Sequence, residues 1–325
     1  MRAKKLKRPN VELVLSRLKQ FQRDTVEYVF QRLYKDGDSQ RRFLIADEVG
    51  LGKTLVAKGL LAKAIDHLWD TVEQIDVVYI CSNSDIARQN ITRLNITGSA
   101  DFEHASRITL LPVRLDHLKP DLNFVSFTPG TSFDLKSNLG VAEERRLIYW
   151  MLRDSWGFED RLNPKNVLQG NVRDTDWWRY YISEFSQDID PLIQKDFERE
   201  LKAFSREERK AGKPGMQERF EGLCDFFSRA DRVITPEMAR ERNQVIGRIR
   251  QLLAKSCLRL LKPDIVIMDE FQRFKHLLSN EDEAGQLAQV LFSYSSEHSE
   301  VRTLLLSATP YKMYTLYEEC EEDDH

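Results

Sequence analysis

The sequence has none of the long apolar runs that a membrane protein needs. A membrane-spanning helix takes about 20 consecutive apolar residues, and no stretch of the 325-residue chain approaches that length. The N-terminal segment 1–8 carries five basic residues and no apolar core, so it is not a secretory signal peptide. We therefore expect a soluble, cytoplasmic protein that does not act at a membrane.

Closely spaced cysteine pairs and an excess of basic charge are also missing. The chain has four cysteines, and no two of them form a Cys-x-x-Cys pair: Cys81, Cys224, Cys257 and Cys320. This excludes a zinc ribbon and a disulfide-built scaffold. The formal net charge is −3, so any binding to nucleic acid must use a local basic surface. With 41% hydrophobic and 31% charged residues, the chain is typical of a globular protein of about two domains.

The segment 47–54, Asp-Glu-Val-Gly-Leu-Gly-Lys-Thr, is the most informative stretch that the sequence does contain. It follows the short apolar run Phe43–Ala46 and precedes an apolar-periodic segment that begins at Leu55, which predicts a strand, a glycine loop and a helix. Such a loop turns its backbone N–H groups toward a polyphosphate at the positive end of the helix. One departure is Asp47, which stands where the strict phosphate-loop pattern has glycine.

The chemistry of this loop predicts ATP and Mg²⁺ as cofactors. In the phosphate-loop pattern the lysine, here Lys53, reaches the β- and γ-phosphates, and the hydroxyl of Thr54 ligates the metal. A lone Gly-Lys-Thr is also a common loop, so the motif does not establish the site by itself. We expect the nucleotide to contact Val49, Gly50, Leu51, Gly52, Lys53 and Thr54.

A second candidate element lies far downstream. The run Ile265–Met268 is apolar and rich in β-branched residues, which predicts a buried parallel strand. It ends in Asp269 and Glu270, and carboxylates at the C-terminal end of such a strand face the ligand crevice. We expect Asp269 to hold Mg²⁺, directly or through water, and Glu270 to orient and deprotonate the attacking water.

A third apolar run, Thr303–Leu306, predicts another buried strand and is followed by the small hydroxyl residues Ser307 and Thr309. At a strand end beside the phosphates, these side chains are candidates to sense the γ-phosphate and to pass that state onward. Each of the three elements has an ordinary structural interpretation when it stands alone. Their order along the chain, each at a predicted strand end, favours one nucleotide site.

The three elements resemble motifs I, II and III of helicase superfamily two. The resemblance rests on segment 47–54, on Asp-Glu-Phe-Gln at 269–272 and on Ser-Ala-Thr at 307–309. In its residues, the first motif most resembles that of the Swi/Snf-type duplex-DNA translocases and, among them, that of the bacterial RapA-like branch. The resemblance implies an α/β fold, a RecA-like P-loop NTPase lobe with a mostly parallel central sheet, and ATP hydrolysis coupled to duplex DNA. It also gives a catalytic role to Gln272, which stands where many relatives have His or Asp.

The resemblance extends upstream to residues 18–23, which are similar to the family's Q-motif. By position, Gln22 takes the role of the glutamine that reads the adenine edge. Without the other motifs, Gln22 is an ordinary glutamine at the start of a helix. The apolar residues that follow it have helical spacing: Val26, Val29, Phe30 and Leu33.

Two weaker motifs fall in the family order and imply contacts with nucleic acid. The strand Val77–Ile80 is followed by Ser82, Asn83 and Ser84, which resemble motif Ia. A strand end that leads into a helix N-terminus suits a nucleic-acid phosphate.

The second of these motifs follows the apolar run that ends at Phe127. Thr128, Pro129 and Gly130 resemble motif Ib, which grips the backbone of the tracked strand. A Thr-Pro-Gly sequence is most often only a turn, so this assignment depends mainly on the resemblance.

The predicted nucleotide-binding lobe is interrupted once. Its first part covers residues 1–135, and its second part, with motifs II and III and an acidic end, covers residues 263–325. Residues 136–262 show helical spacing of apolar residues, which predicts a helical insertion. Turn signals at Asn163-Pro164 and Gly212–Gly215 divide this insertion.

Aromatic and basic residues in the insertion allow two interpretations. The segment 177–181, Trp-Trp-Arg-Tyr-Tyr, suits base stacking or a protein partner, but it also suits a small helical core that needs large side chains, which we prefer. A basic helical stretch leads back to the lobe. Its arginines either face DNA or pair with nearby Glu: Arg240, Arg242, Arg248 and Arg250.

The family needs a second RecA-like lobe, which carries motifs IV, V and VI and the arginine fingers. Arginine fingers are worth about 10³–10⁵ in rate. The chain stops sixteen residues after Thr309. We therefore expect the second lobe to come in cis from a longer protein or in trans from another chain, and we expect little turnover from this chain alone.

Two other classes of function stay open from the sequence. One is a nucleotide-gated protein-interaction module, in which the helical insertion recruits a partner without translocation. The other is an ATPase that acts on RNA or remodels a nucleoprotein complex. Stimulation of ATP hydrolysis by duplex DNA, by RNA or by neither distinguishes the three.

Overall fold

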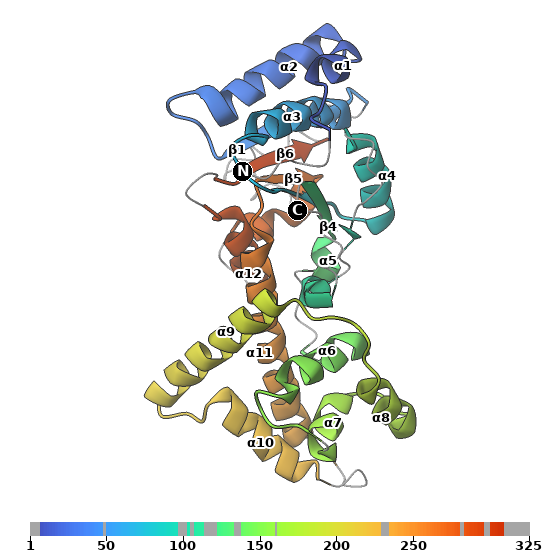
Figure 1. Cartoon of the computed structure of the whole chain (residues 1–325), viewed down its shortest axis with the longest axis vertical. Helices are drawn as coiled ribbons and strands as arrows, with labels where there is room; N and C mark the ends of the chain where they lie inside the picture. The colour runs from blue at the N-terminus through green and yellow to red at the C-terminus, as the bar shows by residue number, and fades with distance from the viewer. Residues whose placement is uncertain are drawn as a thin grey trace, which may run out of the picture. The chain divides into compact units, whose positions relative to one another are not determined.

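The chain forms two compact units. The computed structural model describes residues 7–47, 50–96, 103–104, 107–113, 122–132, 138–159, 161–228, 234–279, 283–295 and 300–308 (Figure 1). The first unit consists of residues 1–106, 118–130 and 262–325, and the second of residues 107–117 and 131–261. Residues 107–117, expected from the sequence in the first lobe, therefore group with the helices of the second unit.

The first unit is built on an all-parallel β-sheet. Five strands follow the order β1-β6-β5-β2-β4, and the two-residue strand β3 (Glu103–His104) pairs with β4 at the edge. The bounds of the five are β1 Arg42–Ala46, β2 Ile75–Ile80, β4 Leu122–Phe127, β5 Ile265–Asp269 and β6 Arg302–Ser307. Each apolar run that predicts a strand forms one. The prediction of an α/β fold with a parallel central sheet is confirmed.

Helices near the N-terminus cover one face of this sheet. Figure 1 shows α1, α2 and α3 stacked over the strands, and their bounds are Val11–Ser16, Gln20–Phe30 and Lys53–Leu68. A π-helical turn, η1 (Gln31–Lys35), continues α2. The apolar side chains with helical spacing are all buried in the core with the sheet, which confirms that prediction: Val26, Val29, Phe30 and Leu33.

The other elements of the first unit follow the strands. They are α4 Ser84–Leu94 after β2, η4 Phe271–Leu278 after β5, and α12 Glu283–Phe292, which packs on η4. A short helix, α5 (Pro129–Ser132), follows β4. Among the described residues, no helix combines the length and the apolar character that crossing a membrane requires.

The described elements of the second unit are helical. They are η2 Ile108–Val113, α6 Ala142–Arg153, α7 Leu162–Gln169, α8 Thr175–Ser183, α9 Pro191–Lys210, α10 Met216–Phe226 and α11 Pro236–Leu261. The predicted turn at Gly212–Gly215 joins α9 to α10 and is confirmed. The predicted turn at Asn163-Pro164 is wrong. Both residues lie in the first turn of α7, where proline is tolerated because its missing N–H has no helical acceptor.

An arginine–glutamate pair lies in the core of the second unit. Arg250 Nη2 donates to Glu144 Oε1 at 2.8 Å, and both side chains are almost completely buried. The Thr109 hydroxyl donates to the same oxygen, and the Val141 N–H donates to Glu144 Oε2 at 2.8 Å. Gly140 is required beside the pair, since its φ is +61° and a Cβ would lie 2.3 Å from Glu144 Oε2.

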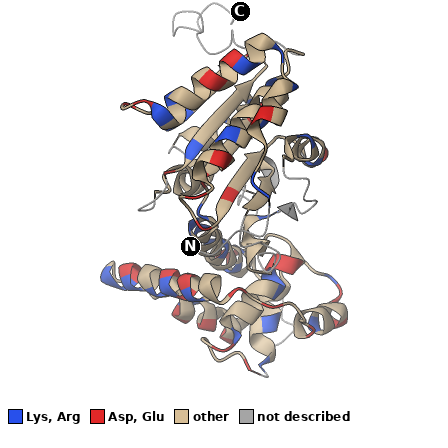
Figure 2. Ribbon diagram, turned by 45° about the horizontal axis from the view of Figure 1, so that its top comes forward, with Lys and Arg blue, Asp and Glu red and all other residues tan. Residues whose placement is uncertain are grey.

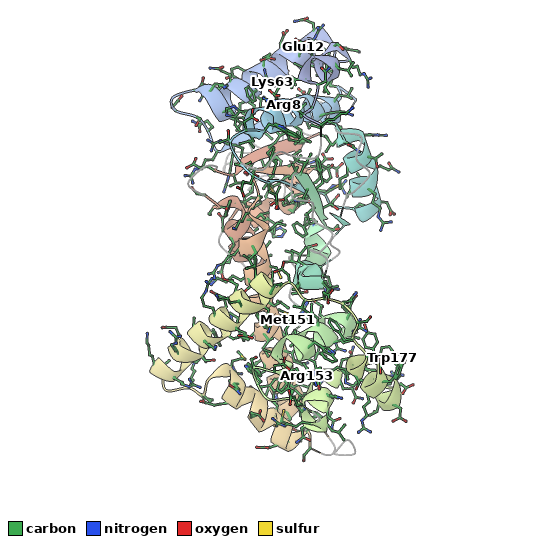
Figure 3. All side chains as sticks on the ribbon, viewed as in Figure 1. Arg8, Glu12, Lys63, Met151, Arg153 and Trp177 are labelled. Atoms are coloured by element: carbon green, nitrogen blue, oxygen red, sulfur yellow. The ribbon has the colours of Figure 1, made fainter. Side chains whose placement is uncertain are left out.

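The basic and aromatic residues of the insertion divide between interior and surface. Arg242 and Arg250 are 6% and 0% exposed, so these two arginines do not contribute to an exposed basic surface. Trp178 is fully buried, as a core residue, whereas Trp177 on α8 is 45% exposed (Figure 3). Figure 2 shows both basic and acidic residues on the helices of this unit.

Two carboxylates are buried at the amino-terminal edge of the sheet. Asp76 on β2 is 4% exposed, and its side chain accepts hydrogen bonds from Asn123 and Gln74 at 2.8 Å. Asp264 lies beside it and accepts the Asp76 N–H at 3.0 Å. Burial raises the pKa of Asp76 to about 7, against the opposing effect of the hydrogen bonds from Asn123 and Gln74.

We predict that Asp76 makes the free energy of unfolding fall as the pH rises. Its pKa is raised in the folded protein, so the folded state binds more protons than the unfolded state between about pH 4 and pH 7. The stability is lost as the pH rises through this window, by about 2 kcal/mol between pH 5.5 and pH 8. Denaturant unfolding at several pH values should show this slope in the wild type and not in Asp76→Asn.

The matched control for this prediction is Glu73→Gln, which changes an exposed carboxylate just before β2. Its pH slope should equal that of the wild type. A slope that persists unchanged in Asp76→Asn contradicts the assignment to Asp76.

Candidate functional site

A glycine loop (residues 47–54) joins β1 to α3 at the carboxyl edge of the sheet. Gly50 and Gly52 have φ of +94° and +84°, in the left-handed region that other residues rarely adopt. The Gly52 carbonyl starts the helix by accepting the N–H of Leu55 at 2.8 Å. Within the described residues, the backbone N–H groups of Gly50, Leu51, Gly52 and Thr54 donate to no protein acceptor. The loop therefore offers a set of N–H donors at a helix N-terminus, which is the chemistry that binds phosphate.

The predicted adenine-reading residue, Gln22, lies directly against the glycine loop. Its side chain is buried, its Nε2 donates to the Leu51 carbonyl at 3.0 Å, and its Oε1 accepts the Lys19 N–H at 3.0 Å. A Cβ on Gly52 would lie 2.5 Å from the same Nε2, so this contact needs a glycine. Gln22 thus braces the loop. The adenine-reading role of Gln22 stays a prediction.

The side chain of Lys53 turns back to the end of β1. Its Nζ donates to the Asp47 carbonyl at 2.7 Å. The Asp47 N–H donates in turn to the Ser307 carbonyl at 3.3 Å, at the end of the neighbouring strand β6. The ammonium group therefore lies at the carboxyl ends of β1 and β6. Val49, the other predicted loop contact, lies outside the described residues.

The two predicted acids lie on the next strand along this edge. Asp269 is the last residue of β5, Glu270 follows it, and both are half-buried. In the parallel register Asp269 pairs with Leu306, and Ser307 pairs with Ala46. Because neighbouring strands are about 4.8 Å apart, β1 and β5 are about 10 Å apart at this edge. The glycine loop and the acids therefore share one edge of the sheet.

Two polar side chains that no motif predicts hold Asp269. The Tyr79 hydroxyl, on β2, donates to Asp269 Oδ2 at 2.5 Å. Asn90 Nδ2, on α4, donates at 3.0 Å to the same oxygen and at 3.0 Å to the Tyr79 hydroxyl oxygen. Burial, together with the Asp269 carboxylate, raises the pKa of Tyr79 well above its ordinary range. The hydroxyl therefore keeps its proton and acts as the donor.

Glu270 has a strained backbone and two side-chain partners. Its φ of +54° lies in the left-handed region, which costs a residue with a Cβ about 1–2 kcal/mol. Its Oε2 forms an ion pair with Arg273 Nε at 2.9 Å and accepts a hydrogen bond from the Ser82 hydroxyl at 3.4 Å. Such strain is typical of functional sites. Ser82, expected to contact nucleic acid, thus lies against the candidate base.

The remaining candidate nucleic-acid residues follow β2 and β4. Asn83 caps α4, since its Oδ1 accepts two backbone N–H groups of the first turn at 2.7 and 3.3 Å, and Ser84 is the first residue of that helix. Thr128 is half-buried, and Pro129 and Gly130 begin the short helix α5, where the sequence suggests a turn after the strand. Contact of these residues with nucleic acid stays a prediction.

The residues expected to sense the γ-phosphate and to pass that state onward are only partly described. Ser307 ends β6 and is fully buried, whereas Thr309 lies outside the described residues. Gln272 lies in η4, and its Oε1 is buried and accepts no hydrogen bond from the described part of the chain. A buried amide oxygen without a donor is costly, so this oxygen is an available acceptor beside the candidate acids.

The described residues contain no group of three or more His, Cys, Asp or Glu side chains arranged to hold a metal ion. Mg²⁺ at a nucleotide needs fewer, because it uses one or two carboxylates and fills its other positions with water and phosphate oxygens. Asp269 fits this demand. It is half-buried, its Oδ2 accepts two hydrogen bonds, and its Oδ1 accepts none within the described part of the chain. Thr54, the second predicted ligand, lies in the first turn of α3.

The sequence carries a weak signal for the two residues that the motifs miss. Tyr79 is the one side chain with a polar tip in the run Val77–Ile80. Asn90 shares the buried face of α4 with Ala87 and Ile91, where a polar group needs a partner. The partner is Asp269 because β2 lies beside β5, and this strand order cannot be predicted from the local sequence.

Comparisons of the chain with protein-family models, with curated proteins and with solved structures find no match in any of the three. The structure by itself shows an α/β domain with a parallel sheet and several helices. Membership of helicase superfamily two stays a proposal, supported by the motifs and by where their residues lie.

We predict that Gly52→Ala lowers the free energy of unfolding by about 1–3 kcal/mol, because alanine is strained at φ +84° and its Cβ meets Gln22. Gly37→Ala is the control, since nothing lies within 4 Å of a Cβ there, and its effect should stay within about 1 kcal/mol. Denaturant unfolding of both variants measures the difference. Equal effects of the two substitutions would show that the loop geometry is not constrained as described.

Proposed function

We propose that this chain is the ATP-binding motor lobe of a nucleic-acid-dependent ATPase of the DNA translocase or helicase type. One observation carries the proposal: the glycine loop, Asp269, Glu270 and Ser307 share one edge of a parallel sheet although they are far apart in the sequence. A nucleoside triphosphate at this edge meets backbone N–H donors, an ammonium group and two carboxylates. These are the groups that bind and hydrolyse ATP in P-loop proteins.

The strand order supports a RecA-like lobe. β6 lies between β1 and β5, so the end of motif III stands between the phosphate loop and the acids. A residue at that position contacts both sides of the nucleotide site, which suits a sensor of the γ-phosphate. The segments after β2 and β4, which resemble motifs Ia and Ib, follow beyond β5 along the same edge.

In this proposal each side chain has a separate task. The N–H groups of residues 50–54 and the ammonium of Lys53 hold the β- and γ-phosphates. Asp269 and Thr54 hold Mg²⁺, which when bound neutralises charge on the phosphate oxygens. Glu270 orients the attacking water and accepts its proton. The segments after β2 and β4 contact duplex DNA, and a second RecA-like lobe completes the site.

We predict that Lys53→Ala weakens ATP binding to the 325-residue chain by about 10–100-fold. The substitution removes a charge-assisted contact to phosphate, which is worth about 1.5–3 kcal/mol. Equilibrium titration with a fluorescent ATP analogue measures the change. Lys63→Ala, on the same helix but in an ion pair with Glu27, should bind as the wild type does. Unchanged affinity in Lys53→Ala contradicts the assignment of the loop.

We predict that Glu270→Gln keeps ATP binding and abolishes hydrolysis, because glutamine fills the same space but cannot accept the proton of the attacking water. The measurement is ATP turnover of the chain completed by its second lobe, in cis or in trans. Glu73→Gln is the exposed control and should turn over normally. Turnover in Glu270→Gln at the wild-type rate would refute the assigned base.

The same turnover assay separates the three classes of function. Stimulation by duplex DNA supports the translocase, and stimulation by structured RNA alone supports an ATPase that acts on RNA. ATP binding without stimulation by either nucleic acid supports a nucleotide-gated interaction module.

A further inference from the structure

We propose that Tyr79 and Asn90 form a positioning pair for Asp269, which fixes its carboxylate so that one oxygen is presented to Mg²⁺. This inference rests on the proposed function, since it concerns the side chains around the metal ligand assigned there. Neither residue belongs to a motif, and neither touches the glycine loop in the described contacts.

The three side chains form a closed triangle of hydrogen bonds. The Tyr79 hydroxyl lies 2.5 Å from Asp269 Oδ2, Asn90 Nδ2 lies 3.0 Å from the same oxygen, and the two donors lie 3.0 Å from each other. Both bonds to Asp269 go to one oxygen. Within the described residues the other oxygen accepts none, so the triangle sets the orientation of the carboxylate and leaves Oδ1 for another partner.

The two donors come from rigid parts of the fold. Tyr79 is 1% exposed and lies in the middle of the sheet, paired with Ser126 on one side and with Ile267 on the other. Asn90 is 8% exposed on the inner face of α4. Side chains held by regular elements position a site more accurately than side chains on loops.

If these hydrogen bonds had only a structural role, they would serve to give the buried Tyr79 hydroxyl a hydrogen-bond partner. The arrangement does more than this, because a single acceptor would satisfy the phenol, whereas here two donors converge on one carboxylate oxygen of the proposed metal ligand. Partners of this kind orient metal ligands, and their loss typically costs 10–100-fold in metal affinity.

The experiment titrates the 325-residue chain with a fluorescent ATP analogue, once across a range of Mg²⁺ concentrations and once with EDTA. Tyr79→Phe removes only the hydroxyl, and Asn90→Ala removes the second donor. In each variant the strengthening of nucleotide binding by Mg²⁺ should fall by about tenfold or more, while binding in EDTA stays as in the wild type. In an Asp269→Asn background, Tyr79→Phe should have no further effect.

Tyr34→Phe is the matched control. It removes another buried hydroxyl of the first unit, one that makes no hydrogen bond within the described part of the chain, and it should leave both titrations unchanged. Thermal unfolding of each variant checks that the protein is folded.

The outcomes separate the two proposals. A wild type that binds no nucleotide, with or without Mg²⁺, overturns the proposed function and this inference with it. A wild type with Mg²⁺-dependent binding that Tyr79→Phe and Asn90→Ala both retain in full overturns the positioning pair alone. Equal losses with Mg²⁺ and with EDTA assign the two residues a structural role and also overturn it.

Discussion

The carboxyl ends of β1, β6 and β5 are neighbours in one parallel sheet, and the whole candidate site depends on this arrangement. Parallel strands place all their carboxyl ends at the same edge, so whatever follows each strand meets there. The register fixes the spacing, since Ala46 pairs with Ser307 and Leu306 pairs with Asp269. The strands bury mostly apolar side chains, so polar groups of the sheet gather at its two edges, and the carboxyl edge is the one where the glycine loop lies.

The sequence predicts those parts of the site that local chemistry determines. The glycine loop and the strand ends at Asp269 and Ser307 follow from short apolar runs and from residues next to them in the chain. The bond between Tyr79 and Asp269 spans 190 positions and needs β2 to lie beside β5, which no local pattern encodes. The turn predicted at Asn163-Pro164 is wrong because the local sequence is ambiguous. Proline fits both a turn and the first turn of a helix.

In the second unit, several charged side chains are buried in the core. Arg145 is 1% exposed and donates to the backbone carbonyls of Leu168 and Gly140 at 2.7 and 2.9 Å, while burial lowers its pKa to about 10. It remains charged at neutral pH. Together with the buried pair of Arg250 and Glu144, it makes this core depend on exact polar partners. Buried ion pairs add little net stability, but removing one partner leaves an uncompensated charge. Counting the arginines of α11 in the sequence therefore overestimates the positive surface available to DNA, because Arg242 and Arg250 are buried.

One continuous segment, residues 79–90, contacts both candidate acids. Tyr79 and Asn90 bond to Asp269, and Ser82 between them bonds to Glu270. In the proposed motor this segment also carries the loop that meets the nucleic-acid strand. A shift of the loop then acts on the candidate base through Ser82, whereas Tyr79 and Asn90 stay held by β2 and α4. Glu270 combines a strained backbone with a carboxylate that is also paired with Arg273. In the proposed motor, the contact of Ser82 with Glu270 thus gives nucleic acid a short physical route to the candidate base, in addition to the proposed route through motif III.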